Sequence, residues 1–294
     1  MAQVAWQARL AAFMLVGFAL AGTAGAEPFV TYEDWTTSQR IRADRWRGLA
    51  TSVQDVEKEQ RGHAVHMRLR REGSAVLGVG SIGAVMELAM ANPPAVEQIE
   101  ADFKITRVTL EGCPEATFFQ STALPAQISL GNLYDETPRL PGERTGDHFA
   151  RISTLRRSTS FDLPDAFQVQ AVIFRCADAG CAGATVAPGT LFAFLGRVFV
   201  GDRFALRLVW DPANSRFLAG LNAEEDVELR YPESLVTGAA VPFAALSMTA
   251  AGANCTAGAG VSDATVEIGE VRTNVGAVIS GRQHEDGGDD DSQR

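Results

Sequence analysis

The sequence predicts an all-β protein, built as an antiparallel sandwich or barrel of many short strands. Three observations lead to this fold class. In most segments rich in apolar residues, apolar and polar residues alternate. Turn residues recur at short intervals, and few segments space their apolar residues with the period of a helix. Alternation with a period of two buries one side of a strand and leaves the other in solvent. Many such strands joined by turns are typical of sandwiches and barrels.

The N-terminal segment, residues 1–26, has the pattern of a secretory signal peptide. Arg9 precedes an apolar run from Leu10 to Ala21, and Ala24-Gly25-Ala26 offers the small-x-small pattern of a cleavage site. The run is too short for a stable membrane span. We therefore expect Glu27 to begin a mature chain without a membrane span, secreted or periplasmic.

The first clear strands lie between residues 64 and 105. In Ala64–Arg70 the apolar Val65, Met67 and Leu69 alternate with His66, Arg68 and Arg70, which predicts a half-buried strand with a cationic outer face. Ile99–Ile105 alternates in the same way. The apolar phase then shifts to Val108, so we expect a bulge near Thr106.

The segment Ser81–Ala91 is ambiguous, because its residue propensities favour a short helix. It overlaps Gly78–Gly83, which matches G-x-G-x-x-G, and acidic residues follow at Glu100 and Asp102. The dinucleotide fingerprint requires a strand before the glycines and a helix after them. The neighbouring strands resemble hairpins and the chain is expected to be exported, so we interpret the glycines as a loop.

The second half of the chain continues with strands. Phe167–Cys176 is apolar on both faces toward its end, as expected of a central strand. Arg203–Trp210 and Arg216–Leu221 flank the turn residues Asp211–Ser215 and predict a hairpin. Thr265–Thr273 reads as a last strand.

The bulk composition sets the domain organisation and excludes some partners. Residues 27–275 are expected to form a single domain, and residues 276–294 a disordered acidic tail. The formal net charge of −10 argues against binding to nucleic acid or to an anionic membrane surface. The basic residues are nearly all arginine, which reflects either genomic base composition or forks for planar anions such as uronic acids or sulfates.

The four cysteines are expected to form disulfides, because an even count in an exported chain favours bridges over a metal site. Three connectivities are open. Cys176 and Cys181 bracket a turn-forming Ala-Asp-Ala-Gly, so we favour that pair, which leaves Cys113 with Cys255.

Several of these segments, taken in order, resemble the concanavalin A-like lectin/glucanase superfamily, and the chain is similar to a bacterial secreted, laminin G-like relative. The resemblance spans roughly Tyr32 to Asn274. It is carried by Ile41–Trp46 (IRADRW), Ile99–Phe103 (IEADF), Thr145–Ile152 (TGDHFARI), Phe174–Cys181 (FRCADAGC), Leu208–Asp211 (LVWD) and Phe217–Asn222 (FLAGLN). The resemblance implies two antiparallel sheets in a jelly roll, one convex and one concave, with ligands on the concave face or at a sheet rim.

The glycosidase branch of that superfamily carries E-x-D-x-E on a concave strand, with the two glutamates as nucleophile and acid/base. Here the matching residues are Glu100, Asp102 and Lys104, so a lysine stands where the second glutamate belongs. An ammonium cannot act as the protonating carboxyl group of a retaining mechanism. Glu100 and Asp102 still share one face of a strand, about 7 Å apart by strand rise. A two-carboxylate enzyme therefore stays an alternative.

The leading function is non-catalytic binding, most plausibly of a glycan on the concave face, with no catalytic residue assigned. The candidate ligand-binding residues, chosen by alternation and by the resemblance, are Glu100, Asp102, Lys104, Arg151, Gln168 and Gln170. The alternatives are a polysaccharide hydrolase or lyase, and a module that contacts an extracellular protein.

Other chemistry receives little support from the sequence. No G-x-S-x-G elbow accompanies the histidines, so His63 and His66 are interpreted as surface residues and His148 as structural or rim. No cofactor is expected. Calcium is possible through Asp135, Glu136 and Asp147, although no D-x-D-x-D-G loop occurs.

The tryptophans have two readings. Trp46 and Trp210 lie in apolar alternation and are predicted to be in the core. Trp35 precedes the sandwich, and either packing in the core or stacking on a sugar ring is open for it.

Overall fold

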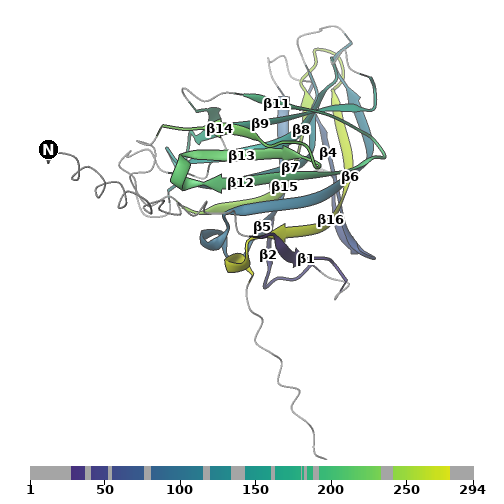
Figure 1. Cartoon of the computed structure of the whole chain (residues 1–294). Helices are drawn as coiled ribbons and strands as arrows, with labels where there is room; N and C mark the ends of the chain where they lie inside the picture. Colours follow the sequence, from purple (N-terminus) through teal and green to yellow (C-terminus); the bar gives the residue numbers. More distant parts are fainter. Residues whose placement is uncertain are drawn as a thin grey trace, which may run out of the picture.

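Two antiparallel β-sheets face each other across one apolar core in the computed structural model of the protein (Figure 1). The structure describes residues 28–36, 41–51, 55–75, 81–114, 120–133, 143–159, 163–179, 181, 184–187, 192–232 and 241–278. The predicted signal peptide and residues 279–294 of the acidic tail lie outside these ranges. Every strand pairing among the described residues is antiparallel, which confirms the predicted all-β sandwich of the jelly-roll type.

Sheet A contains both terminal strands. Its order is β14-β13-β12-β6-β16-β4-β3, and β1 pairs with β16 beside this path. The strands are β1 (Val30–Glu33), β3 (Asp55–Arg61), β4 (Ala64–Glu72), β6 (Gln98–Glu111), β12 (Arg203–Asp211), β13 (Arg216–Leu221), β14 (Val227–Arg230) and β16 (Val261–Thr273).

Sheet B lies on the other side of the core. Its order is β10-β9-β8-β7-β15-β5-β2, and β11 also pairs with β9. The strands are β2 (Trp46–Thr51), β5 (Ser81–Met90), β7 (Thr122–Leu133), β8 (His148–Arg157), β9 (Ala166–Cys176), β10 (Ala184–Val186), β11 (Ala193–Phe199) and β15 (Phe243–Ala253). Short 3₁₀ turns occupy Pro93–Ala95, Pro212–Asn214 and Val275–Ala277.

Alternation decides which side of each strand is buried. On β4 the side chains of Val65, Met67 and Leu69 are fully buried in the core, and the residues between them face outward. Burying one such side chain contributes about 1.5–3 kcal/mol relative to leaving it exposed. The predicted bulge also occurs. Ile105 and Arg107 pair with consecutive residues of β16, so Thr106 is the extra residue that shifts the phase.

The Ser81–Ala91 segment is a strand, and the expected short helix is wrong. Ala84, Met86, Leu88 and Met90 alternate into the core, while β15 and β2 pair with the two edges of the strand. Hydrogen bonding along both edges and burial of four side chains outweigh the helical propensity of these residues. Residues 78–80 of the glycine motif lie outside the described residues, whereas residues 81–83 belong to β5.

The predicted hairpin, the last strand and the strand over Phe167–Cys176 are all present, as β12–β13, β16 and β9. The hairpin turns through Pro212–Asn214 and then through Ser215, which adopts a left-handed conformation with φ of 51°. Ordered structure extends past the predicted end of the domain at residue 275, because Ala277 is fully buried in the core.

Trp35 belongs to the core. Its side chain is 1% exposed, its ring stacks on Trp46 with centroids 5.6 Å apart, and its indole N–H donates to the Gly269 carbonyl at 2.5 Å. The sugar-stacking reading of Trp35 is therefore not supported by its position. Trp210 packs against the same core and donates to the hydroxyl of Tyr231.

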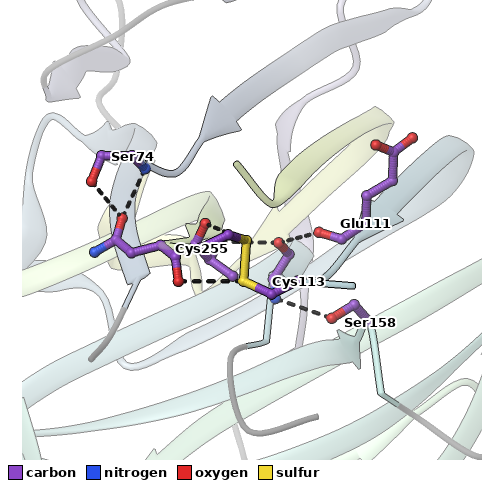
Figure 2. Close-up of a disulfide and its surroundings, with 8 residues drawn as sticks. Ser74, Glu111, Cys113, Ser158 and Cys255 are labelled. Carbon is purple, nitrogen blue, oxygen red and sulfur yellow. Dashed lines mark hydrogen bonds between the residues drawn. A yellow bond between two sulfur atoms is a disulfide. The ribbon is translucent and has the colours of Figure 1, made fainter. Parts of the chain in front are cut away.

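Both favoured disulfides are formed. Cys176 and Cys181 close a small loop after β9. Cys113 and Cys255 are 142 residues apart in sequence and join the end of β6 to the end of β15, so this bridge ties sheet A to sheet B. Figure 2 shows the bridge among hydrogen bonds of neighbouring segments, such as those that the Ser74 N–H and hydroxyl donate to Asn254 Oδ1 at 2.9 and 3.0 Å.

Two bridges are typical of a chain that folds in an oxidising compartment. Among the described residues there is no helix long and apolar enough to cross a membrane.

Candidate functional site

The outward residues of β6 lie on the outer face of sheet A. Ile99, Ala101 and Phe103 fill the core, so Glu100 and Asp102 point away from it, as does Lys104. Three of the six predicted ligand-binding residues are thus together on one face. The remaining three lie elsewhere.

Glu100 is enclosed by arginines from the two strands beside β6. Its Oε2 accepts from Nη1 of Arg207 on β12 at 3.2 Å, and its Oε1 lies 2.6 Å from Nη2 of Arg272 on β16. Glu100 is only 8% exposed, and Arg207 is also paired with Asp226. Both carboxylate oxygens are therefore occupied by protein groups. This arrangement leaves Glu100 poorly placed to protonate or attack a substrate.

Asp102 lies near the same arginine. Its carboxylate is 3.8 Å from Nη2 of Arg272, and burial raises its pKa, opposed by the charge of Arg272. Elsewhere on this outer face Arg68 holds Asp263 in a two-point contact, with Nε and Nη2 at 3.1 and 2.9 Å from the two carboxylate oxygens. His66 lies 3.9 Å from Glu267. The outer face of sheet A is a network of ion pairs across adjacent strands.

The outer face of sheet B has different chemistry. A row of polar side chains crosses five adjacent strands in register: Gln170 of β9, Ser153 of β8, Gln127 of β7, Ser247 of β15 and Glu87 of β5. We call these five residues the polar row. In β7 and β8, as in the other strands, residues next to each row member in sequence point into the core. Because side chains alternate along a strand, the members of the polar row point outward. Its three central members are buried, whereas its two end members are half-buried.

Gln127 lies at the centre of the polar row, and only the nitrogen of its side-chain amide is hydrogen-bonded within the part of the chain that the structure describes. Its Nε2 donates to Thr249 Oγ1 at 2.8 Å and to the Leu124 carbonyl at 3.3 Å. Its Oε1 is buried and accepts no hydrogen bond from the described residues. A buried acceptor without a donor costs free energy, which a hydrogen bond from a ligand or a water molecule would recover.

Arg151 lies one row away on β8. Its guanidinium carbon is 5.1 Å from the ring centroid of Phe149 and 5.1 Å from that of Phe174, and its Nε donates to Ser129 Oγ at 3.1 Å. The two rings and the hydroxyl fix the plane of the guanidinium. Burial lowers the pKa of Arg151 to about 10, a shift that the charge of Glu87 opposes. Arg151 remains a cation at neutral pH.

The aromatic side of this face depends on Gly131. A Cβ at that position would lie 2.3 Å from Cβ of Phe149, so only glycine lets the two strands hold Phe149 there. Phe149 then contacts Phe174 and Phe243, with ring centroids 5.6 and 5.9 Å away. The rings form an apolar platform beside the polar row.

Glu87 and Arg144 complete the charges near the platform. Burial raises the pKa of Glu87, and the charges of Arg144 and Arg151 oppose this rise. The guanidinium of Arg144 lies over the ring of Phe243, 4.4 Å from its centroid. On the outer faces of the sheet B strands, among the residues that the structure describes, Glu87 is the single carboxylate.

Arg151, Gln168 and Gln170 lie on the outer face of sheet B, because Phe167, Val169 and Ala171 of β9 fill the core. The six predicted residues are therefore divided between opposite faces of the sandwich and do not form one site. Alternation identified all six as outward. It could not identify the sheet to which each strand belongs.

Sequence reasoning also missed several residues of this face: Glu87, Gln127, Ser129, Ser153 and Ser247. Single polar residues between apolar ones, as in Ala126–Leu130 (AQISL), were the available signal.

The three predicted calcium ligands are not seen together. Asp135 and Glu136 lie outside the described residues. Asp147 is buried, and its Oδ2 accepts from the Val241 N–H at 3.1 Å. Within the described ranges no three acidic, histidine or cysteine side chains are grouped as a metal site. Of the histidines, His148 is buried at the start of β8, as a structural residue would be. Calcium binding stays a prediction.

Comparison with known proteins finds no family model and no curated protein that matches this chain. Solved structures similar to it include GH16 enzymes and a carbohydrate recognition domain. One is the β-porphyranase BpGH16B from the human gut bacterium Bacteroides plebeius, with 8% identity and a TM-score of 0.42 over 85% of this chain and 92% of that one.

Two others illustrate the range. LamAcat from Zobellia galactanivorans has 11% identity and a TM-score of 0.39 over 82% of this chain and 97% of that one. The Emp46p carbohydrate recognition domain, in its potassium-bound form, has 12% identity and a TM-score of 0.39 over 81% and 95%. A sialidase is also similar, but this chain spans only 18% of its length. The architecture described above is established by the strand pairing of this chain itself.

Proposed function

We propose that the protein is a carbohydrate-binding module, acting in the periplasm or outside the cell, and that its ligand lies on the outer face of sheet B. The observation that carries this proposal is the polar row beside a platform of phenylalanine rings. Amides, hydroxyls and a carboxylate in register across five strands present donors and acceptors in a plane. Sugar hydroxyls need such groups, and beside them Phe174 and Phe243 are half-buried and offer apolar surface to a sugar ring, whereas Phe149 is covered.

The same geometry favours binding over hydrolysis. A glycosidase of the ordinary kind needs two carboxyl groups on either side of the scissile bond. On the described strands of sheet B, Glu87 is the single candidate, and on sheet A Glu100 is already bonded to two arginines. We therefore propose recognition without cleavage.

A glycan array with the chain from residue 27 onward tests the proposal. The site variants are Gln170→Ala and Glu87→Gln, at the two half-buried ends of the polar row. The matched control is Glu267→Gln, the same substitution on the outer face of sheet A, and Asp102→Asn tests that face directly. Each protein is screened with calcium and with a chelator.

We expect saturable binding that Gln170→Ala weakens at least several-fold and that Glu267→Gln leaves unchanged. Loss of binding only in Asp102→Asn would place the site on sheet A and refute the proposed face. Release of reducing ends from a bound glycan would favour the enzyme alternative. Absence of binding to every glycan would reject the proposal in favour of a protein ligand.

A further inference from the structure

Arg151 has hydrogen-bond donors that the described residues leave unused. Of its five N–H groups, the one on Nε is donated to Ser129. In the described part of the chain, no carboxylate lies within ion-pair distance of its guanidinium, and Nη1 and Nη2 have no acceptor. The two terminal nitrogens therefore form an open, planar fork.

The arginines on the outer face of sheet A provide the contrast. The side chains of Arg68, Arg207 and Arg272 are 28%, 21% and 35% exposed, and each is paired with a carboxylate. Arg151 is half-buried, like them, but it lies on phenylalanine rings instead of beside a carboxylate. Holding a half-buried cation without a directly paired carboxylate costs free energy, which the more distant charge of Glu87 offsets only in part and a bound anion would offset further.

The geometry also limits what this anion is. Ser129 and the rings of Phe149 and Phe174 fix the guanidinium plane, so the fork suits a group that presents two oxygens side by side. Ser153 follows Arg151 on the same face of β8, about 7 Å along the strand. That is close to the width of a sugar ring, so an anionic substituent on Arg151 would bring ring hydroxyls to the polar row.

We propose that the glycan carries an oxyanion, a sugar carboxylate or a sulfate ester, that pairs in bidentate fashion with Nη1 and Nη2 of Arg151. This inference depends on the proposed function, because it names the class of sugar bound at that face. Ser129 acts as a positioning residue for the fork.

Calorimetric titration with three probes tests the inference: oligogalacturonate, its methyl-esterified neutral form, and a sulfated galactan oligosaccharide. The variants are Arg151→Lys, which keeps the charge and loses the fork, and Ser129→Ala, which removes the Nε acceptor. Arg203→Lys is the matched control on the outer face of sheet A. Thermal unfolding of each variant confirms that it is folded.

We expect an acidic probe to bind at least tenfold more tightly than the neutral one, by the usual strength of a charge-assisted pair. Arg151→Lys should weaken that binding about tenfold or more, whereas Arg203→Lys should not. If the sulfated probe binds and the uronate does not, the result supports the same role for Arg151 and identifies the bound group as a sulfate ester.

Equal binding of the acidic and neutral probes, unaffected by Arg151→Lys, would overturn this inference and leave carbohydrate binding intact. Absence of binding by all three probes, together with a negative glycan array, would overturn the proposed function as well.

Discussion

Removing the disulfide that joins the two sheets should cost far more stability than removing the small-loop disulfide. Cys113–Cys255 closes a loop of 142 residues, and Cys176–Cys181 one of 5. The chain-entropy model assigns about 5 kcal/mol to the first loop and about 2 kcal/mol to the second, a difference of about 3 kcal/mol. The difference depends on the logarithm of the loop ratio alone, so the constant term of the model cancels.

The assay compares Cys113→Ala/Cys255→Ala with Cys176→Ala/Cys181→Ala by thermal unfolding, each against the unaltered chain. For a domain of this size each kcal/mol lowers Tm by about 2 °C, so the losses should be about 10 °C and about 4 °C. Each double variant also acts as the control for the other. If the small-loop variant lost as much as the inter-sheet variant, the entropic reasoning would be refuted.

Two further predictions concern sheet B. Gly131→Ala should destabilise the domain by about 1–3 kcal/mol in urea unfolding, because its Cβ would lie 2.3 Å from Cβ of Phe149. Gly83→Ala on β5, with no atom within 4 Å of its Cβ, should be nearly neutral, and an equal loss there would contradict the steric argument. For Glu87 the raised pKa means that the protonated form favours folding below its unfolded pKa, and that this contribution is lost as pH rises through the folded pKa. Glu87→Gln should therefore match the unaltered chain at pH 4 and be relatively more stable at pH 7, and the reverse order would show that its carboxylate stabilises the fold.

The sequence predicted six of the strands, β4, β6, β9, β12, β13 and β16, and the reason is visible in β4 and β6. Each strand has the core on one side and charged partners on the other, so hydrophobic residues alternate with mostly charged ones along Ala64–Arg70 and Ile99–Ile105. Thr106 could be identified as a bulge because it breaks that alternation. The strand Ser81–Met90 could not be predicted from its residues, because Ala, Met, Leu and Glu favour a helix. Its pairing with β15 and β2 along both edges makes it a strand.

The candidate site was harder to predict for a geometric reason. Alternation distinguishes side chains that point into the core from those that point outward. A sandwich has two outer faces, one on each sheet, and the alternating pattern is the same for strands of either sheet. Glu100 and Arg151 are equally outward in the sequence, yet the core lies between their strands. Assembling the polar row also requires the shift in register between Ala123 and Gln127 of β7. That shift follows from pairing between distant segments, and local composition does not reveal it.

The pairing of β1 with β16 has a practical consequence. Val30 lies opposite Thr273, so the first and last described strands are neighbours in sheet A. A tag or fused domain attached directly before Val30 would therefore begin in sheet A, on the side of the core away from the outer face of sheet B. A short linker from Thr273 to Val30 would span neighbouring residues, so a circularly permuted chain could be opened at an exposed turn such as that of Gly62.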